Sequence, residues 1–373
     1  MQLRLLQREA FNPLPLGAGH YVAALQTKAG ERSALAEASP KTWSRMTPLI
    51  QVLGPKKPKG PLRAPTVRGW AKDVASVVGD HPCFLDILRL QPTQATVMAA
   101  GQQQPLLTYL YQAVRKHGLR FVPVVPVGDP RASYRDLVRD AAAEDGRGVA
   151  LRWKALEVMP PPGMTPAELL SKTLAALESN LTTADLLVDL GYLSPDADLP
   201  PETVAERLNA AAAMGPWRNI VLLGTSMPAT LGCIAEGEVG ALPRREWDLW
   251  SALSDPNLKL KRLPSYGDYA IQHPKPPQDG GGPGMRANIR YTTQHATLIA
   301  RGRGSITQEG KRQYVELCRQ LTKRQEFAGA DSSWGDRTIQ SCADGMIPPG
   351  AQDLWRGVGT SHHLRLVTDQ LPR

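Results

Sequence analysis

The sequence is poor in cysteine and has none of the spacings that cysteine chemistry usually needs. Its four cysteines lie far apart in a chain of 373 residues, with no Cys-x-x-Cys pair and no cysteine at zinc-ligand spacing from a histidine. This pattern excludes a compact zinc site and a disulfide framework. We expect reduced thiols, mostly buried as small apolar groups, at Cys83, Cys233, Cys318 and Cys342.

Long apolar runs are missing as well. No stretch approaches the roughly eighteen unbroken apolar residues of a membrane-spanning helix. The opening residues, MQLRLLQREAFNPLPLG, have neither the continuous apolar segment nor the small-residue cleavage site of a secretory signal. The composition, 42% hydrophobic and 21% charged, is ordinary for a globular protein. We expect a cytoplasmic protein without a membrane partner.

Three common catalytic motifs are absent. The sequence contains no GxSxG, HExxH or GxxxxGK[ST], which removes the usual serine-hydrolase, zincin and P-loop readings. The glycine run at residues 280–282 does not follow a strand and open a helix, so we interpret it as a loop.

Positive charge is in excess. Lys and Arg number 44 against 35 Asp and Glu, a formal net charge of +9. This excess is compatible with a polyanionic partner such as nucleic acid or a nucleotide. The basic residues are mostly dispersed, and the densest group alternates with prolines, as a solvated loop would: Lys56, Lys57, Lys59 and Arg63.

Along the chain, short apolar runs alternate with segments that have helical periodicity. Eight such units imply parallel strands with right-handed crossovers, and their simplest closed arrangement is a (β/α)8 TIM-like barrel. The fourth run contains two prolines, which argue against a central strand, but the alternation requires a strand there. The predicted strands are residues 20–26, 47–53, 83–88, 120–127, 148–153, 185–190, 219–223 and 266–271.

The pattern changes after the eighth predicted strand. Residues 272–304 are predicted to form an inserted loop and β-hairpin, with strand-like runs at 287–293 and 297–300. Residues 305–373 are predicted to form a C-terminal helical extension, whose amphipathic segment 309–327 would be the eighth outer helix. We therefore expect residues 1–373 to form a single barrel domain with these two additions.

Short motifs in one order along nearly the whole chain carry a family resemblance. They are KAGE at 28–31, PL at 48–49, LD at 85–86, VDLG at 188–191, RE at 245–246, YGDY at 266–269, NIRYT at 288–292, RG at 301–302, SWGD at 333–336, WR at 355–356, and Gly359, Thr360, His362 and His363. With them the chain resembles the beta family proteins, named after a protein of a T-even bacteriophage. Such proteins usually have a glutamate at the end of the second strand, where this chain has Gln51. The resemblance implies a phage-related or mobile-element setting, including defence, and no particular reaction.

In a parallel barrel, reactive groups come from the carboxyl ends of the strands and the loops after them. Asp86 and Asp189 are the most informative candidates, because a carboxylate inside an apolar strand must find a cation, a metal or hydrogen-bond donors. One interpretation is a general acid/base pair or ligands of a divalent metal ion. The other is a structural ion pair with Lys28 or Arg152. Candidates near strand ends are Lys28, Glu31, Gln51, Asp86, Arg152, Lys154, Asp189, Ser226 and His273.

A second group of candidates lies in the last third of the chain. Arginines bind phosphate or carboxylate through two parallel hydrogen bonds, and histidine changes protonation near neutral pH, so the group would suit an anionic ligand. Solvated charged helices would give the same pattern, and the adjacent histidines cannot both face one site. Asp268 is most simply a turn residue, with a catalytic role as the alternative. The group is Asp268, Arg290, Arg301, Asp336, Arg356, His362 and His363.

These observations lead to one hypothesis. A pocket at the barrel mouth would use Asp86, Asp189 and His362 in catalysis, and Lys28, Glu31, Arg152, Asp268, Arg290, Arg301, Asp336 and Arg356 in binding. It would serve a phage-related or phage-defence protein that binds a phosphate-bearing ligand, a nucleotide or nucleic acid, or acts on it as a phosphodiesterase-like hydrolase, with a divalent metal ion as the candidate cofactor. The alternative is a non-catalytic recognition subunit that senses a phage protein, a defence-system protein or nucleic acid.

Overall fold

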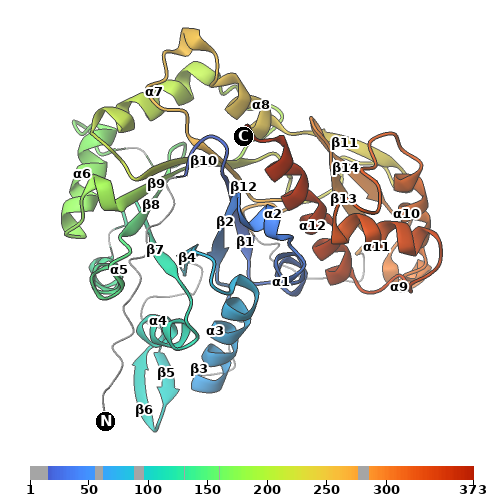
Figure 1. Ribbon diagram of the computed structural model, residues 1–373, viewed down its shortest axis with the longest axis horizontal. Coiled ribbons are helices and arrows are strands. Elements are labelled where there is room, and N and C mark those ends of the chain that lie inside the picture. The colour runs from blue at the N-terminus through green and yellow to red at the C-terminus, as the bar shows by residue number, and fades with distance from the viewer. Residues whose placement is uncertain (1–15, 55–61, 88–95, 130, 159, 276–284) are drawn as a thin grey trace.

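The computed structural model describes residues 16–54, 62–87, 96–129, 131–158, 160–275 and 285–373. Lys56, Lys57 and Lys59 of the basic loop, and the glycines at 280–282, lie outside the described residues. Figure 1 shows a barrel with helices around it and a smaller C-terminal subdomain beside it, built from a short sheet and helices. Within the described part of the chain, no helix has the length and apolar character needed to cross a membrane.

Eight parallel strands close into a barrel, which confirms the (β/α)8 prediction. They follow one another around the barrel in the order β1-β12-β10-β9-β8-β7-β4-β2. The proline-containing segment is one of them and pairs with a strand on each side. The strands are β1 (Tyr21–Gln26), β2 (Met46–Gln51), β4 (Cys83–Asp86), β7 (Phe121–Pro126), β8 (Val149–Lys154), β9 (Ala184–Tyr192), β10 (Asn219–Thr225) and β12 (Ser265–Asp268).

Alternation along the strands separates two apolar cores. Leu49, Phe84 and Leu187 point into the barrel with their neighbours, whereas Tyr21 and Leu85 belong to the larger core between strands and helices. Because side chains alternate, the residues two positions beyond Leu49, Phe84 and Leu187 also face the interior. These are Gln51, Asp86 and Asp189, so alternation places polar groups at the carboxyl end of the lumen.

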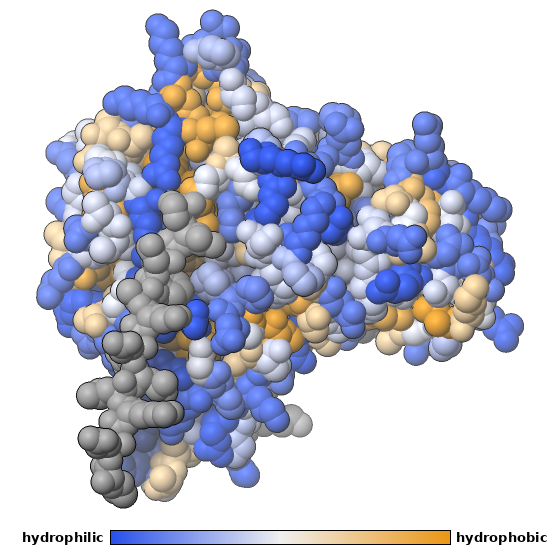
Figure 2. Space-filling view, in the orientation of Figure 1, coloured by the Kyte–Doolittle hydropathy of each residue, from blue (hydrophilic) through white to orange (hydrophobic). Residues whose placement is uncertain are grey.

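Helices cover the outside of the barrel. Some begin at clear N-terminal signals; α6, for instance, starts at a capping box formed by Thr165 and Glu168. The helices between barrel strands are α1 (Ala29–Ala36), α2 (Pro40–Trp43), α3 (Ala64–Val78), α4 (Leu106–Lys116), α5 (Ala132–Asp145), α6 (Pro166–Ala176), α7 (Pro201–Ala213) and α8 (Arg245–Ala252), with two 3-10 turns, η1 (Leu181–Thr183) and η2 (Pro256–Leu258). A small sheet of β3 (Leu62–Arg63), β5 (Thr96–Ala99) and β6 (Gln102–Pro105) lies beside α3 and α4. On the face in Figure 2, apolar residues gather near the top of the view, over the α7 and α8 region.

The eighth outer position belongs to a different helix from the one predicted. The last helix, α12 (Gln352–Gln370), packs against α1, α2 and β1, and Leu364 and Val367 join the main core. The predicted segment 309–327 contains α10 (Gln313–Thr322) instead, which packs on the C-terminal subdomain. That prediction is therefore wrong.

The C-terminal subdomain is built around the predicted hairpin. Strands β13 (Asn288–Thr292) and β14 (Ala296–Arg301) pair antiparallel, which confirms the two runs. The sheet gains an unpredicted third strand, β11 (Val239–Pro243), from the connection between β10 and α8. Its core unites the sheet with α10, α11 (Trp334–Ala343) and the first half of α12, and α9 (Ile306–Glu309) lies beside it.

Glycines allow α12 to approach both the barrel and the hairpin closely. A Cβ atom on Gly30 of α1 would lie 2.5 Å from the backbone oxygen of Asp353, and one on Gly359 would lie 2.5 Å from the backbone oxygen of Arg290. Neither backbone oxygen can move without shifting its element. Larger residues at these positions would therefore separate α12 from its two neighbours.

We predict that Gly30→Ala and Gly359→Ala each lower the free energy of unfolding by about 1–3 kcal/mol, because the methyl group overlaps backbone atoms. The matched control is Gly69→Ala in α3, where a Cβ would meet no atom within 4 Å. That control should raise stability by up to about 1 kcal/mol through helix propensity. Urea unfolding measures all three, and equal effects at the three positions would contradict the close packing of α12.

Candidate functional site

A buried ion network fills the carboxyl end of the barrel lumen. The guanidinium of Arg152 donates to Asp86, to Asp189 (Nε to Oδ2, 2.9 Å) and to the hydroxyl of Tyr269 (2.5 Å). Gln51 donates its amide to Asp86 at 3.2 Å, and Tyr269 donates to Asp189 at 2.7 Å. All five side chains are buried. The two aspartates are therefore brought together as predicted, but as the structural ion pair that was one of the two interpretations.

The charges in this network support one another. Burial alone would favour the neutral form of Arg152, but the neighbouring Tyr269, Asp189 and Asp86 raise its pKa well above the ordinary value. A buried arginine between two carboxylates satisfies all three groups. Asp86 and Asp189 therefore hold the barrel strands together, and their proposed catalytic role stays a prediction.

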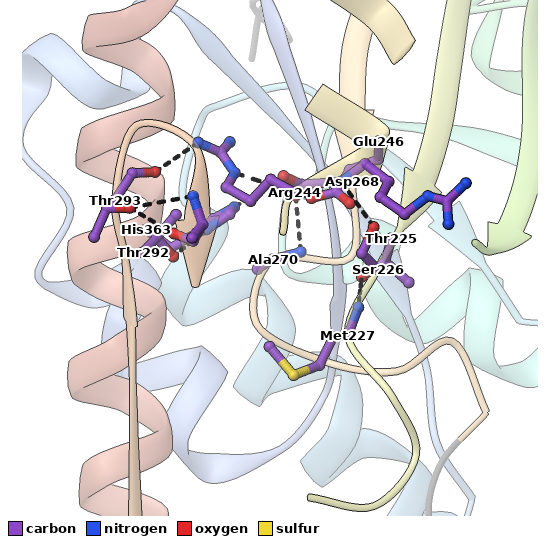
Figure 3. A network of polar contacts seen from close by, with 12 residues as sticks. Thr225, Ser226, Met227, Arg244, Glu246, Asp268, Ala270, Thr292, Thr293 and His363 are labelled. Carbon is purple, nitrogen blue, oxygen red and sulfur yellow. Dashed lines mark hydrogen bonds and ion pairs between the residues drawn. The ribbon is translucent and has the colours of Figure 1, made fainter. Parts of the chain in front are cut away.

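The next polar cluster lies on the outer wall of the barrel, under α12. Asp268 accepts hydrogen bonds from Tyr21 and from Tyr266 (2.9 Å), and the Nε2 atom of His363 lies 2.9 Å from it. Burial disfavours the ionised carboxylate, but His363 and Tyr21 together hold the pKa of Asp268 below its usual range. Figure 3 shows this region, with Arg244 between Asp268 and Thr293 of the hairpin connection. Asp268 is thus a buried structural partner of α12.

The second histidine faces a different carboxylate. His362 places Nδ1 3.0 Å from Asp336 and Nε2 2.7 Å from the backbone oxygen of Thr292, and its ring stacks on Tyr291. The hydroxyl of Thr292 lies 2.8 Å from Nδ1 of His363, so one hairpin residue joins both histidine–aspartate pairs. As predicted, the adjacent histidines do not face one site. Both pairs are buried and brace the subdomain against the barrel.

Arg301 lies apart from these groups. On β14, it donates to the backbone oxygens of Leu231 (3.0 Å) and Ile234, and its Nη2 lies 3.9 Å from Glu236. It therefore holds the connection between β10 and β11 against the hairpin.

The remaining charged candidates meet where α1, the hairpin and α12 surround the end of β1. Strand β12 pairs with β1 only as far as Ala23, so the backbone N–H of Gln26 has no partner on that side. Glu31, in the first turn of α1, accepts a hydrogen bond from this N–H at 3.1 Å through Oε2. Because β12 ends before β1 does, the N–H of Gln26 is left to bind the buried carboxylate of Glu31 at the mouth of the barrel.

The electrostatics of this corner are unbalanced. Burial raises the pKa of Glu31 to about 7, against the opposing effects of Lys28 and Arg356. Burial, helped by Arg356, lowers the pKa of Arg290 to about 10, and Glu31 only partly compensates. The corner holds more positive than negative charge near neutral pH.

A small pocket opens beside Arg290 and Arg356. It encloses about 20 Å³, room for about one water molecule. Arg290 donates to the backbone oxygen of Ile271 and, at 3.4 Å, to the side chain of Gln272; Arg356 donates to Asp353 at 2.7 Å and is 25% exposed. The lining residues are Ile271, Gln272, Asn288, Arg290, Gln352, Trp355 and Arg356.

The structure thus divides the predicted residues into separate groups. One group lies at the mouth and consists of Lys28, Glu31, Arg290 and Arg356. A second group is the lumen network of Asp86, Arg152 and Asp189. A third group braces the subdomain against the barrel and contains Asp268, Asp336 and His362, and Arg301 lies apart from all three. The pocket residues Gln272 and Asn288 were not among the predicted ones, and nothing in their spacing marks them. In the part of the chain described, no group of three or more His, Cys, Asp or Glu side chains could hold a metal ion.

Fold and site together define a (β/α)8 barrel with a C-terminal α/β subdomain beside it. Residues 21–369 match the Beta protein family, nearly the whole chain, and the protein belongs to that family. The match confirms the resemblance that the short motifs indicated. No curated protein matches the chain.

We predict that Arg152→Gln lowers the free energy of unfolding by about 3–5 kcal/mol, because it leaves two buried carboxylates facing one another without a cation. A triple variant with Asp86→Asn and Asp189→Asn added should recover much of that loss, since it removes the unpaired charges. Chemical denaturation at pH 7 measures both variants. A single variant as stable as the wild type would show that the network contributes little.

Proposed function

We propose that the corner between α1, β13 and α12 binds the phosphate group of a nucleotide or nucleic-acid ligand. The single observation that supports this most is that two arginines, Arg290 and Arg356, line one small pocket at the mouth of the barrel. The buried carboxyl of Glu31, whose pKa is raised by burial, lies near them. Two neighbouring cations gain from an added anion, and guanidinium groups bind phosphate oxygens through paired hydrogen bonds. The position, at the carboxyl end of a parallel barrel, is where such folds bind ligands.

Entry of a phosphate requires the pocket to open, because its present volume suits only a water-sized group. Arg356 is the side chain able to move, since it is partly exposed and its ion pair with Asp353 lies at the surface. A phosphate can replace Asp353 as its partner. Most of the ligand then extends from the pocket over the rim of the barrel.

Glu31 gives the same site a group for proton transfer. A carboxyl with a pKa near 7 can act as acid or base at neutral pH, which suits hydrolysis of a phosphodiester. We therefore propose a phosphodiesterase-like activity in a phage-related or phage-defence setting, the setting that the family resemblance implies. Any catalytic role of Asp86 or Asp189 in it would first require release from Arg152.

The alternative is a recognition protein without catalysis. One observation favours it: the carboxylates of Asp86 and Asp189 are held by Arg152 and Tyr269. In this case the same corner would bind a phosphate-bearing partner and leave it unchanged. Binding without turnover of a phosphodiester substrate would identify this function.

We predict that Arg356→Gln weakens the binding of nucleoside phosphates at least about tenfold, which corresponds to the loss of one charge-assisted hydrogen bond. The matched control is Arg365→Gln on the same helix, an arginine that is also 25% exposed and also paired with an aspartate. Isothermal titration calorimetry at fixed salt measures both. Equal losses in the two variants would indicate general electrostatic attraction and contradict a site at this corner.

Binding at this corner should also depend on pH through Glu31. Its pKa is raised to about 7, so the carboxyl is mostly neutral below pH 7 and mostly ionised above it. We predict that affinity for a dinucleotide falls as pH rises from 6 to 8, because ionised Glu31 repels the phosphate, and that Glu31→Gln removes this dependence. A dinucleotide is suitable because its phosphodiester does not titrate in this range. An unchanged pH profile in Glu31→Gln would exclude Glu31 from the site.

A further inference from the structure

Several buried polar atoms at one edge of the barrel mouth have no hydrogen-bond partner among the described residues. Three are side-chain oxygens, Oε1 of Gln26, Glu31 and Gln51, and one is an amide nitrogen, Nε2 of Gln272. These four residues are only 4%, 0%, 1% and 8% exposed, respectively. Buried polar groups are nearly always hydrogen-bonded, so such a cluster is unusual.

The four groups lie on adjacent segments of the barrel. Gln26 and Gln51 are the last residues of β1 and β2 and are partners in register. Glu31 is hydrogen-bonded to the backbone of Gln26, and Gln272 follows β12, the other neighbour of β1. Gln272 also lines the pocket that contains Arg290 and Arg356. Glu31 is close enough for the charge of Arg356 to act on it, whereas Gln26 and Gln51 lie further into the barrel.

The orientation of one of these amides is fixed by its surroundings. The amide nitrogen of Gln51 donates to Asp86 at 3.2 Å, so its oxygen must be the free atom. An oxygen acceptor of this kind cannot bind phosphate oxygens, which are acceptors themselves. What it can bind is a hydroxyl or an N–H group of the ligand.

We propose that the ligand carries neighbouring hydroxyl groups beside its phosphate, as a ribonucleotide or a sugar phosphate does. In this arrangement Arg290 and Arg356 bind the phosphate, and the oxygens of Gln26 and Gln51 accept hydrogen bonds from the hydroxyls. This inference rests on the proposed phosphate site and adds the selection of ribose over deoxyribose. A site with buried acceptors discriminates strongly against a ligand that lacks the hydroxyl, because the acceptors stay unpaired.

Calorimetry with four probes tests the inference: ribose 5-phosphate, 2-deoxyribose 5-phosphate, glycerol phosphate and inorganic phosphate. The wild-type protein should bind ribose 5-phosphate at least about tenfold more tightly than 2-deoxyribose 5-phosphate or inorganic phosphate. Adenosine 5′-monophosphate, as a further probe, distinguishes a ribonucleotide ligand from a sugar phosphate. A nucleotide site gains affinity from the base, and a sugar phosphate site does not.

Two variants test whether the preference for ribose comes from the side chains of Gln26 and Gln51. Gln26→Leu and Gln51→Leu should each reduce the preference for ribose to within about twofold, while binding of inorganic phosphate stays unchanged. Gln26→Leu is the safer variant, because Gln51 also supports Asp86. Thermal unfolding confirms that each variant is folded before its binding is compared.

The outcomes separate this inference from the proposed function. Equal wild-type affinity for all four probes would overturn the selection of hydroxyl groups but leave the phosphate site standing. A ribose preference that survives in both glutamine variants would also overturn it, since other groups would then be responsible. If no phosphate compound binds at all, the phosphate site itself is wrong.

Discussion

The bridge from Arg152 to two aspartates is the interaction on which the barrel mouth depends. Asp86 comes from β4, Arg152 from β8 and Asp189 from β9, so the bridge crosses the lumen between strands that are not all neighbours. It also holds Tyr269, the first residue after β12. The segment that follows Tyr269 contains Ile271 and Gln272, which face the pocket. A buried ion network thereby sets the position of two residues of the small pocket.

One short turn separates the two buried networks. Asp268 points outward to His363 and Tyr269 points inward to Asp189, as alternation requires of consecutive strand residues. Ala270 then adopts a left-handed conformation, with φ of +48°, and donates its N–H to Asp268 at 2.8 Å. Left-handed backbone is costly for alanine, and the hydrogen bond offsets part of that cost. The turn redirects the chain from the barrel to the hairpin that supplies Arg290.

Much of this fold could be predicted from the sequence, because barrel strands and hairpin strands are continuous apolar runs. The position of α12 could not, because α12 packs against the barrel on one side and the subdomain on the other. A helix buried on two sides shows no single apolar stripe, whereas α10 has such a stripe and invites the wrong assignment. Strand β11 contains glycine and proline and pairs only at the edge of β14, so it gives no strand signal either.

The sequence predicted many of the residues of the candidate site, but not which of them lie together. A charged residue inside an apolar strand must be paired. An ion pair with Arg152 was therefore one of the two interpretations of Asp86 and Asp189. The grouping of Glu31 with Arg290 and Arg356 depends on β12 pairing with only part of β1 and on α12 crossing the hairpin. These are properties of register and tertiary packing. Neither has a counterpart in the local sequence.

The place of α12 in the ring of outer helices has a consequence for synthesis on the ribosome. The barrel wall beside α1 stays uncovered until residues 352–370 have left the exit tunnel, and the subdomain core shares the first half of the same helix. Neither part can complete its core during translation of the segments before it. The nascent chain must therefore keep an apolar barrel face exposed until α12 has been synthesised, a period in which a chaperone would have its largest effect on yield.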